Sequence, residues 1–468
     1  MDTKKIQLLE HTPVPKALIT LALPTILGMM VQILYNLTDI FFVGKLNDPF
    51  QVAAVAIATP IFMMFLAISG ILGNGGASFV SRLLGQKNYR LAKQTSATAF
   101  YSCLIVSLFV TVAALFLLPQ ILKISGASEK TYAFAASYLR IIVLGSGIIM
   151  LNFTASQLIR SEGGAKISMM GMMIGTGINI ILDPVFIFVL HQGVSGAAAA
   201  TLIGNSAGLL FYISYYQRGK SLVSIHPRYF SPKKRIYSEI IQVGLPSSIS
   251  HILISLSQAF TLRIAGAYGD SVVAAIGIVM RLITIPFMLN IGLAIGAQPL
   301  IGYSYGACNH DRLKASVKIS AVTATLLSTL FAILFFLFPR IFIGSFIQDT
   351  EVIARGVRIL YAFSLPLPLI GIQMIFMSAM QSMGKGLPAL IISACRQGLV
   401  YLPAILILNA WFGFSGFIYA QAVADFFSLL LSIAFFVKVL SEFEKEADLK
   451  NFKGLSADSP EILPSIID

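Results

Sequence analysis

Four polar side chains stand out because each lies in a long apolar stretch. Asp39 lies near the N-terminus, Asn179 and Asp183 lie in the stretch INIILDPVFIFVL, and Thr201 lies in the small-residue run SGAAAATLIGN. A carboxylate at the centre of a bilayer costs about 2.5–3.5 kcal/mol even on insertion scales, so such residues are functional candidates. Asn179 and Asp183 are four residues apart and therefore share one helix face. This set of oxygen ligands predicts a site for a small cation, and either H⁺ or Na⁺ suits it.

A structural role is the alternative for these acids. A buried aspartate is also stabilised when it pairs with an arginine or accepts hydrogen bonds from neighbouring hydroxyl groups. The sequence favours the ion site without excluding this alternative.

Two prolines lie close to the acids. Pro184 follows Asp183 directly and lacks an amide hydrogen, which leaves the carbonyl of Ile180 without its helical partner. Pro24 lies about four turns before Asp39 in the same apolar stretch, where it can bend the helix. We therefore expect a pliable backbone beside Asp183 and a bend or hinge in the helix that carries Asp39.

The composition is that of a membrane protein. Of 468 residues, 57% are hydrophobic and only 11% are charged. A bilayer core of about 30 Å needs roughly 20 apolar residues per helix, and the apolar segments are too long and uniform for barrel strands. We predict an all-α integral membrane protein with twelve transmembrane helices, at residues 17–42, 52–81, 94–122, 138–159, 167–190, 194–217, 240–265, 272–303, 317–339, 357–384, 387–409 and 414–437.

The net charge of +13 follows the predicted spans and does not indicate nucleic-acid binding. Basic residues gather in alternate loops, including 82–93, 218–235 and 312–318, whereas loops 191–193 and 266–271 hold no Lys or Arg. This positive-inside pattern predicts a multi-pass protein of the plasma (inner) membrane with both termini in the cytoplasm. The first apolar stretch is as long as the others, so we expect a retained helix and no cleavable signal peptide.

The chain repeats weakly at an offset near 221 residues. LPTILGMMVQILYNL from Leu23 resembles LPSSISHILISLSQA from Leu245, and GVSGAAAATLIGN from Gly193 resembles GFSGFIYAQAVAD from Gly413. Six spans per half predict a parallel repeat, with two pseudo-symmetric six-helix lobes around a central cavity. The predicted divisions are an N-terminal segment 1–15, an N-lobe 16–217, a linker 218–238, a C-lobe 239–440 and a tail 441–468, which we expect to hold a short helix and then disorder.

Four further charged residues lie inside predicted spans, and for these a structural role is favoured. Arg396 and Asp425 would neutralise each other as a pair, and the others are Arg263 and Arg281. His251 and Trp411 lie near the ends of spans, as interfacial residues do. The three cysteines are too scattered for a disulfide framework or a metal site.

Several side chains are candidates to line a substrate cavity. Tyr35 and Asn36 lie one turn before Asp39, and Arg281 lies in the eighth span. Met173 and Met288 belong to a set of methionines that could adapt to ligands of different shape. Ordinary packing is the favoured interpretation of the methionines.

The chain resembles the multidrug and toxic compound extrusion (MATE) family, and within it the bacterial MepA-like and DinF-like branches. The resemblance runs from about residue 10 to 440. It is carried by LPTILGMMVQILYNLTDIFFVG, QLIRSEGGAKISMMGMMIGTGINIILDPVFIF, GVSGAAAATLIGN and GAQPLIGYSYGA.

The resemblance implies a secondary transporter that exports cationic or amphipathic drugs in exchange for H⁺ or Na⁺. It implies no cofactor and no enzymatic activity, and we expect a monomer in contact with membrane lipid. The family's cation-responsive cluster matches Asp39, Asn179, Asp183 and Thr201, its bending proline matches Pro24, and a polar position on helix four falls near Gln157. Other branches use acids in helices seven and ten, and this sequence has none there.

Two other functions remain as alternatives. A flippase for a lipid-linked sugar or cell-wall precursor would need basic side chains for its pyrophosphate, and Arg263, Arg281 and Arg396 keep that alternative open. A membrane enzyme or receptor is disfavoured, because the sequence holds no HExxH, phosphate-binding loop, nucleophile elbow or sizeable soluble domain.

Overall fold

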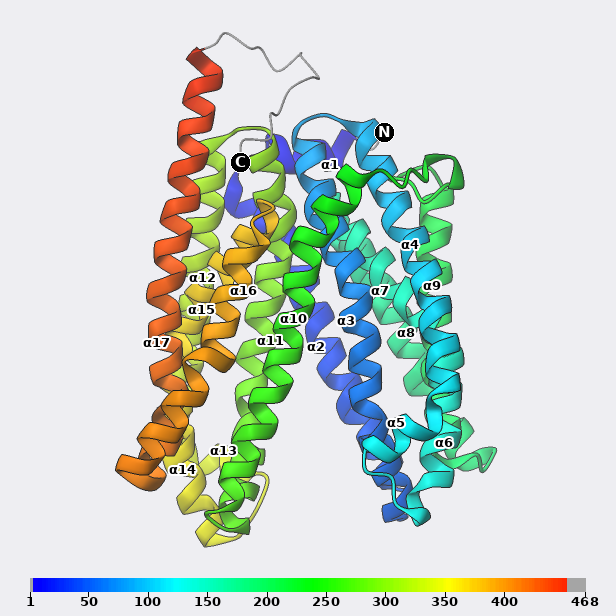
Figure 1. Ribbon diagram of the computed structural model, residues 1–468, viewed down its shortest axis with the longest axis vertical. Coiled ribbons are helices and arrows are strands. Elements are labelled where there is room, and N and C mark those ends of the chain that lie inside the picture. Colours follow the sequence, from blue (N-terminus) through cyan, green and yellow to red (C-terminus); the bar gives the residue numbers. More distant parts are fainter. Residues whose placement is uncertain (1–2, 453–468) are drawn as a thin grey trace.

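The computed structural model describes residues 3–452, with side chains for residues 4–445 other than Asn36. Every regular element in this part of the chain is a helix (Figure 1). The first half holds α1 (Thr3–Glu10), α2 (Val14–Gly44), α3 (Pro49–Gly85), α4 (Tyr89–Phe116), α5 (Leu118–Ile124), α6 (Glu129–Leu144), α7 (Ser146–Ser161), α8 (Ala165–Pro184), the π-helical turn η1 (Val185–Val189) and α9 (Gly193–Gln217). The second half holds the 3₁₀ turn η2 (Pro227–Tyr229), α10 (Lys234–Gly266), α11 (Asp270–Gly306), α12 (His310–Leu337), α13 (Pro339–Gly344), α14 (Thr350–Ser364), α15 (Leu367–Ser382), α16 (Gly386–Ala394), the π-helical turn η3 (Cys395–Leu399) and α17 (Tyr401–Phe452).

The helices of residues 3–452 account for twelve spans. Nine of them are long and apolar enough to cross a bilayer, and the bent pairs α6 with α7 and α14 with α15 add two more. One of the nine, Gly386–Lys445, has 60 residues, or about 90 Å of helix, which is three times the bilayer core. It reverses at Gly413, where φ is 56°, and therefore holds two spans. The predicted all-α fold with twelve transmembrane helices is confirmed.

Three predicted spans are wrong in detail because the chain bends or breaks inside them. Residues 94–122 divide into α4 and α5, since Pro119 lacks an amide hydrogen and begins a new helix. Residues 138–159 bend by 51° between α6 and α7, where Gly145 leaves room for Leu202 of α9. Residues 357–384 bend by 43° between α14 and α15, and Pro366 caps the second of these helices.

The segments outside the spans also carry structure. Residues 3–10 of the predicted N-terminal segment form α1, and the linker contains η2 and the first turn of α10. The helix expected in the tail is the end of α17, which runs to Phe452. The disorder expected beyond it concerns residues 453–468, which lie outside the described part.

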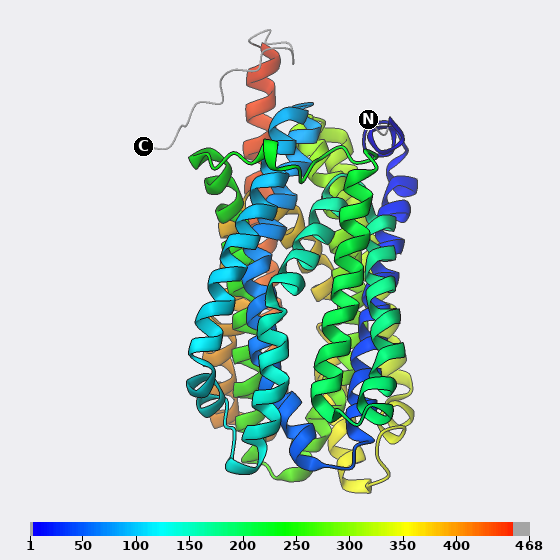
Figure 2. The ribbon, with the colours of Figure 1, turned by 90° about the vertical axis from the view of Figure 1, so that its right-hand side faces the viewer.

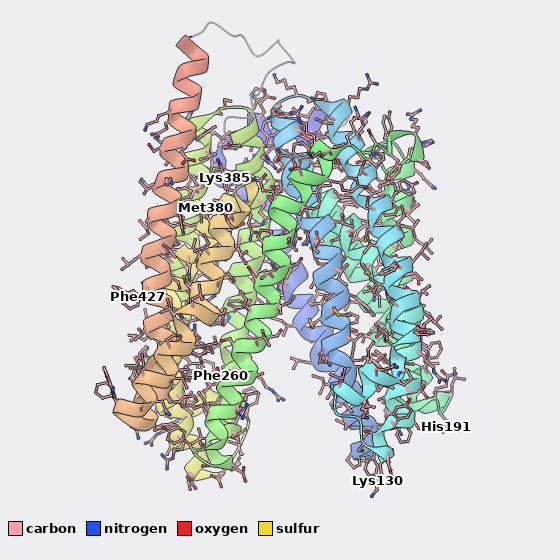
Figure 3. All side chains as sticks on the ribbon, viewed as in Figure 1. Lys130, His191, Phe260, Met380, Lys385 and Phe427 are labelled. Carbon is pink, nitrogen blue, oxygen red and sulfur yellow. The ribbon has the colours of Figure 1, made fainter. Side chains whose placement is uncertain are left out.

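Two helical bundles make up the molecule, α2–α9 and α10–α17 (Figure 1). Their ribbons lie together at the end that carries α1 and diverge toward the other end, and the long helices run along the long axis (Figure 2). Lys385 lies near the end that carries α1, whereas Lys130 and His191 lie at the opposite end (Figure 3).

Glycines allow backbones of the two bundles to touch near α1. A Cβ atom on Gly75 of α3 would lie 2.0 Å from the carbonyl oxygen of Ile240 in α10, and one on Gly244 of α10 would lie 1.9 Å from that of Ile71. Gly85 approaches the backbone of Tyr303 in α11 as closely. Small residues permit such contact between helices in membranes. We call this end, with its contacts of α3 to α10 and α11, the closed end.

Each bundle has its own apolar core, and further apolar side chains face outward. The largest cluster lies almost wholly in the first half and another lies wholly in the second. Phe109, Phe116 and Trp411 are 74%, 84% and 75% exposed. Such exposure suits a surface in contact with lipid, because lipid tails impose no penalty on it.

The contact at Gly75 gives a test of the closed end. We expect Gly75→Ala to lower the free energy of unfolding by about 1–3 kcal/mol, because the added methyl group has no space against Ile240. Thermal unfolding in detergent measures the change. Gly177→Ala in α8 is the matched control, since nothing lies within 4 Å of its Cβ position. Equal loss of stability in both variants would contradict this packing.

Candidate cation-binding site

Three helices of the first lobe bring the predicted cation ligands together. Asn179 of α8 lies 3.4 Å from Asp183 Oδ1 and 3.3 Å from Thr201 Oγ1 of α9, measured from its amide nitrogen. With the amide turned over, its nitrogen donates to Asp183 Oδ2 at 3.2 Å and its oxygen accepts from the Thr201 backbone at 3.0 Å. Asn179 therefore links Asp183 to Thr201 in either orientation.

Helix α2 joins this site through Tyr35. The Tyr35 hydroxyl lies 3.3 Å from Thr201 Oγ1, and Asp39 follows Tyr35 by one turn on the same face. We call Tyr35, Asp39, Asn179, Asp183 and Thr201 the N-lobe cluster. The side chain of the neighbouring predicted residue, Asn36, lies outside the described part of the structure.

Close helix packing explains why these side chains meet. A Cβ atom on Gly204 of α9 would lie 2.5 Å from the Gly175 oxygen of α8 and 3.0 Å from Asn179 Cβ. Gly28 of α2 likewise leaves room for Met172 of α8. Because glycine has no side chain, α2 and α9 approach α8 closely enough for short polar side chains to touch.

The N-lobe cluster is buried at Asn179, Asp183 and Thr201 and half-buried at Tyr35 and Asp39. Asp183, Asn179 and Thr201 are 0%, 2% and 4% exposed. Asp39 Oδ1 is buried and accepts no hydrogen bond from any described residue. Among the described side chains, no Lys, Arg or His forms an ion pair with either acid.

Electrostatic repulsion makes this arrangement receptive to positive charge. The carboxylates of Asp39 and Asp183 are close enough to interact electrostatically. The hydroxyl groups of Tyr35 and Tyr138 also lie within electrostatic range of both carboxylates. Two like charges in a medium of low dielectric are stabilised by proton uptake or by a bound cation. Two carboxylates, an amide oxygen and a hydroxyl are oxygen donors that suit Na⁺ as a hard cation.

The backbone beside Asp183 is irregular but stays helical. The helix does not break at Pro184 but continues as the π-helical turn η1, in which the Leu190 amide donates to the Val185 carbonyl at 2.9 Å. A π-helical turn absorbs the lost hydrogen bond by shifting the ladder by one residue, and such turns are frequent at functional sites. Helix α2 runs unbroken through Pro24.

Four other predicted cavity residues lie away from the N-lobe cluster. Gln157 is buried on α7 beside a cavity of about 10 Å³ that Arg160 and Gln298 also line. Met173 is exposed on the face of α8 opposite Gly175. Met288 is half-buried on α11.

Arg281 lies on the face of α11 that is turned toward the first lobe. It is exposed, and it precedes Gly292 by about three turns on the same helix face. A Cβ atom on Gly292 would lie 2.8 Å from Ile26 Cα of α2. Arg281 therefore lies on the face of α11 that contacts α2 farther along the helix.

The remaining charges inside the spans divide into a pair and isolated groups. Arg396 Nε lies 2.7 Å from Asp425 Oδ1, with side chains 11% and 0% exposed, so the predicted ion pair is confirmed. Gln421 also donates to Asp425 at 3.1 Å. Arg263 and His251 are exposed on α10.

One buried acid, Glu162, was not predicted from the sequence. Its carboxylate is fully buried and lies 2.6 Å from Lys5 Nζ in α1. It also accepts hydrogen bonds from Tyr215 and Ser221. Nothing local in the sequence marks it, because Lys5 is 157 residues away along the chain and Glu162 lies in a short loop between spans.

These observations define a class: an integral membrane transporter of two six-helix lobes with an acidic cluster in one lobe. The MatE family model matches residues 24–185 and 246–407, one range in each half. The chain belongs to this family.

Similar proteins agree with this assignment. The multidrug export protein MepA of Staphylococcus aureus (strain MRSA252) is 32% identical over 425 residues, which are 91% of this chain and 94% of that protein. MepA of Staphylococcus haemolyticus is 31% identical over the same shares.

Two solved structures extend the likeness to the fold. An outward-facing multidrug resistance MATE family transporter of the MOP superfamily superposes with a TM-score of 0.90 at 27% identity, over 95% of this chain and 100% of that one. A MOP superfamily transporter from Pyrococcus furiosus, described as having a binding pocket of reversed polarity, gives 0.89 at 27% identity, over 95% and 99%.

The ion pair of the second lobe can be tested by unfolding. We expect Arg396→Met to lower the free energy of unfolding by about 3–5 kcal/mol, because it leaves the Asp425 carboxylate buried without its partner. The double variant Arg396→Met with Asp425→Leu should recover most of this loss, since an apolar pair needs no compensation. Chemical denaturation in detergent compares the three proteins. A double variant no more stable than the single one would show that the pair does not act as a unit.

Proposed function

We propose that this protein is a secondary active multidrug efflux transporter that exchanges H⁺ or Na⁺ for cationic or amphipathic small molecules. The observation that supports this most directly is the N-lobe cluster, where Asp39 and Asp183 lie without an ion-pair partner among the described side chains. The MepA relatives are named multidrug export proteins. Both termini lie in the cytoplasm in this proposal, and the chain acts as a monomer in the plasma membrane.

The proposed mechanism depends on the two charge states of the N-lobe cluster. While the acids are negative, they attract a cationic drug. When a proton or Na⁺ enters from outside, the charge is neutralised and the links of Asn179 to Asp183 and of Tyr35 to Thr201 rearrange. Helix α2 then bends at Pro24, and the drug is released.

Coupling requires a difference in ion affinity between the two orientations of the lobes. An ion shifts a conformational equilibrium only by its different affinity for the two states. The N-lobe cluster supplies that difference, because α2 contributes Tyr35 and Asp39 and also packs against α11 of the second lobe. Movement of α2 therefore acts on the ion site and on the lobe contact together.

The orientation follows from charge. The basic loops around residues 82–93 and 218–235 lie at the closed end with α1, and the loop that holds His191 lies at the opposite end (Figure 3). The positive-inside rule assigns the closed end to the cytoplasm. The described conformation is then outward-facing, and the diverging ends of the lobes face the exterior.

Efflux from inverted vesicles under an imposed H⁺ or Na⁺ gradient tests the acids. We expect Asp39→Asn and Asp183→Asn each to lower gradient-driven drug transport at least tenfold, because a neutral amide can neither take up the proton nor balance the charge of Na⁺. Asp270→Asn is the control, since Asp270 is an exposed acid at the first turn of α11. If both variants transport drug as well as the parent under either gradient, Asp39 and Asp183 do not couple transport to the ion.

A flippase for a lipid-linked precursor is the second candidate, and one observation keeps it open. Arg396 is neutralised by Asp425, but Arg281 is exposed on the face of α11 turned toward the first lobe. A pyrophosphate on a cargo would bind such a guanidinium.

Arg281→Ala separates the two candidates. If the cargo is a cationic drug, we expect its transport to stay within about twofold of the parent, because a surface charge changes the interaction only weakly. If the cargo is a lipid pyrophosphate, flipping in reconstituted vesicles falls by tenfold or more, since a charged hydrogen bond is lost. Arg263→Ala serves as the control on α10. A tenfold loss of drug efflux in Arg281→Ala would contradict the proposal for cationic cargo.

A further inference from the structure

Helix α1 lies at the closed end and contacts both lobes (Figures 1 and 2). It has only eight residues, and residues 11–13 join it directly to α2, which carries Pro24 and Asp39. Its contacts form two sets, one to each lobe, and each set involves charged groups.

The first set anchors α1 to the first lobe. Lys5 Nζ lies 2.6 Å from Glu162 Oε1 and also contacts the Tyr215 hydroxyl. Leu9 is fully buried in the apolar core of that lobe and packs beside Gly163. Because the Glu162 carboxylate is completely buried, loss of Lys5 would leave it without its only ion-pair partner among the described residues.

The second set anchors α1 to the second lobe. Arg312 at the start of α12 donates through Nε to the Leu9 carbonyl at 2.8 Å and through Nη2 to the Leu8 carbonyl at 3.3 Å. The last carbonyls of a helix lack partners within it, and a guanidinium there also opposes the negative end of the helix dipole. Tyr303 of α11 donates to Glu10 Oε2 at 2.9 Å.

The lobes also touch each other directly beside α1. Arg82 of α3 pairs with Glu239 of α10 at 2.9 Å, and Ser78 donates to the Gln381 carbonyl at 2.6 Å. Any conformation that opens this end must break these contacts. It must also detach α1 from one lobe, because a helix of about 12 Å cannot keep both sets of hydrogen bonds while its two supports move apart.

We propose that α1 is a strap that holds the lobes together at the closed end and detaches from the second lobe when that end opens. The contacts of α1 with the second lobe are the ones that break, because they are part-buried hydrogen bonds to backbone carbonyls. The contacts with the first lobe are stronger, since they combine a buried ion pair with an apolar contact. The strap then remains with the first lobe and with α2. This inference rests on the alternating access of the proposed function, but not on its cargo or its coupling ion.

Inter-lobe distances test the strap without any transport assay. Spin labels at the exposed positions Arg90 on α4 and Lys318 on α12, in a chain whose three native cysteines are replaced by alanine, report opening of the closed end. We expect Arg312→Gln to raise the ratio of open to closed molecules about tenfold, since hydrogen bonds from a charged donor are lost. Lys5→Gln should act in the same direction.

The double variant distinguishes a strap from two independent stabilising contacts. A strap no longer holds the lobes together once either of its two sets of contacts is lost. The ratio of open to closed molecules in the double variant Lys5→Gln with Arg312→Gln should therefore not exceed the ratio in the stronger single variant. Multiplying effects, or no effect of Arg312→Gln, would overturn the inference. If Lys5→Gln does not fold, Arg312→Gln alone still decides, because its partners are backbone carbonyls.

A control variant on α12 tests whether the effect is specific to Arg312. Lys314→Gln removes the same charge two residues further along α12, but Lys314 pairs with Glu444 of α17 inside the second lobe, so it should leave the distances unchanged. Opening of equal size in Lys314→Gln would also overturn the strap. Distances in the parent at high and low pH, with and without Na⁺, establish separately whether the lobes alternate, so failure of the strap and failure of the transport mechanism give different results.

Discussion

The structure depends on one electrostatic constraint: the carboxylates of Asp39 and Asp183 lie in one cluster of the first lobe, and neither forms an ion pair with a basic side chain of the described residues. Asp183 is fully buried, and its polar neighbours Asn179 and Thr201 are neutral. A carboxylate in such surroundings is stable only when its charge is cancelled or when the site can open to water. In the proposed function, occupancy by a small positive ion is therefore linked to the conformation of α2, α8 and α9.

The buried acid of the second lobe, Asp425, has a basic partner. Each lobe contains a π-helical turn, η1 and η3, at different positions of the repeat, and the acid near η3 is neutralised within its own lobe by Arg396. The two halves follow one plan of helices but differ in charge. This asymmetry supports assigning ion coupling to one lobe and leaves the other as the partner against which it moves.

Helix α2 takes part both in the closed end and in the N-lobe cluster, so the proposed function joins them in one conformational equilibrium. Its first turns follow α1 and pack against Gly292 and Gly296 of α11, whereas its later turns carry Tyr35 and Asp39 into the first lobe. Glycine contacts and charged anchors hold one end, and the diverging bundles expose the other. A change of charge at the N-lobe cluster can thus reach the lobe contact through a single helix.

The sequence alone determined the features that depend on local pattern. The length of the apolar segments set the twelve spans, and the four-residue spacing of Asn179 and Asp183 placed them on one helix face. The pair of Arg396 and Asp425 was also predictable. Only the tertiary structure decided the other pairings, because they depend on which helices become neighbours: Lys5 meets Glu162 across 157 residues, and Asp183 meets no cation among the described side chains. The bends at Gly145 and near Pro366 could likewise not be predicted from the sequence, since hydropathy records how apolar a span is but not the direction in which its helix runs.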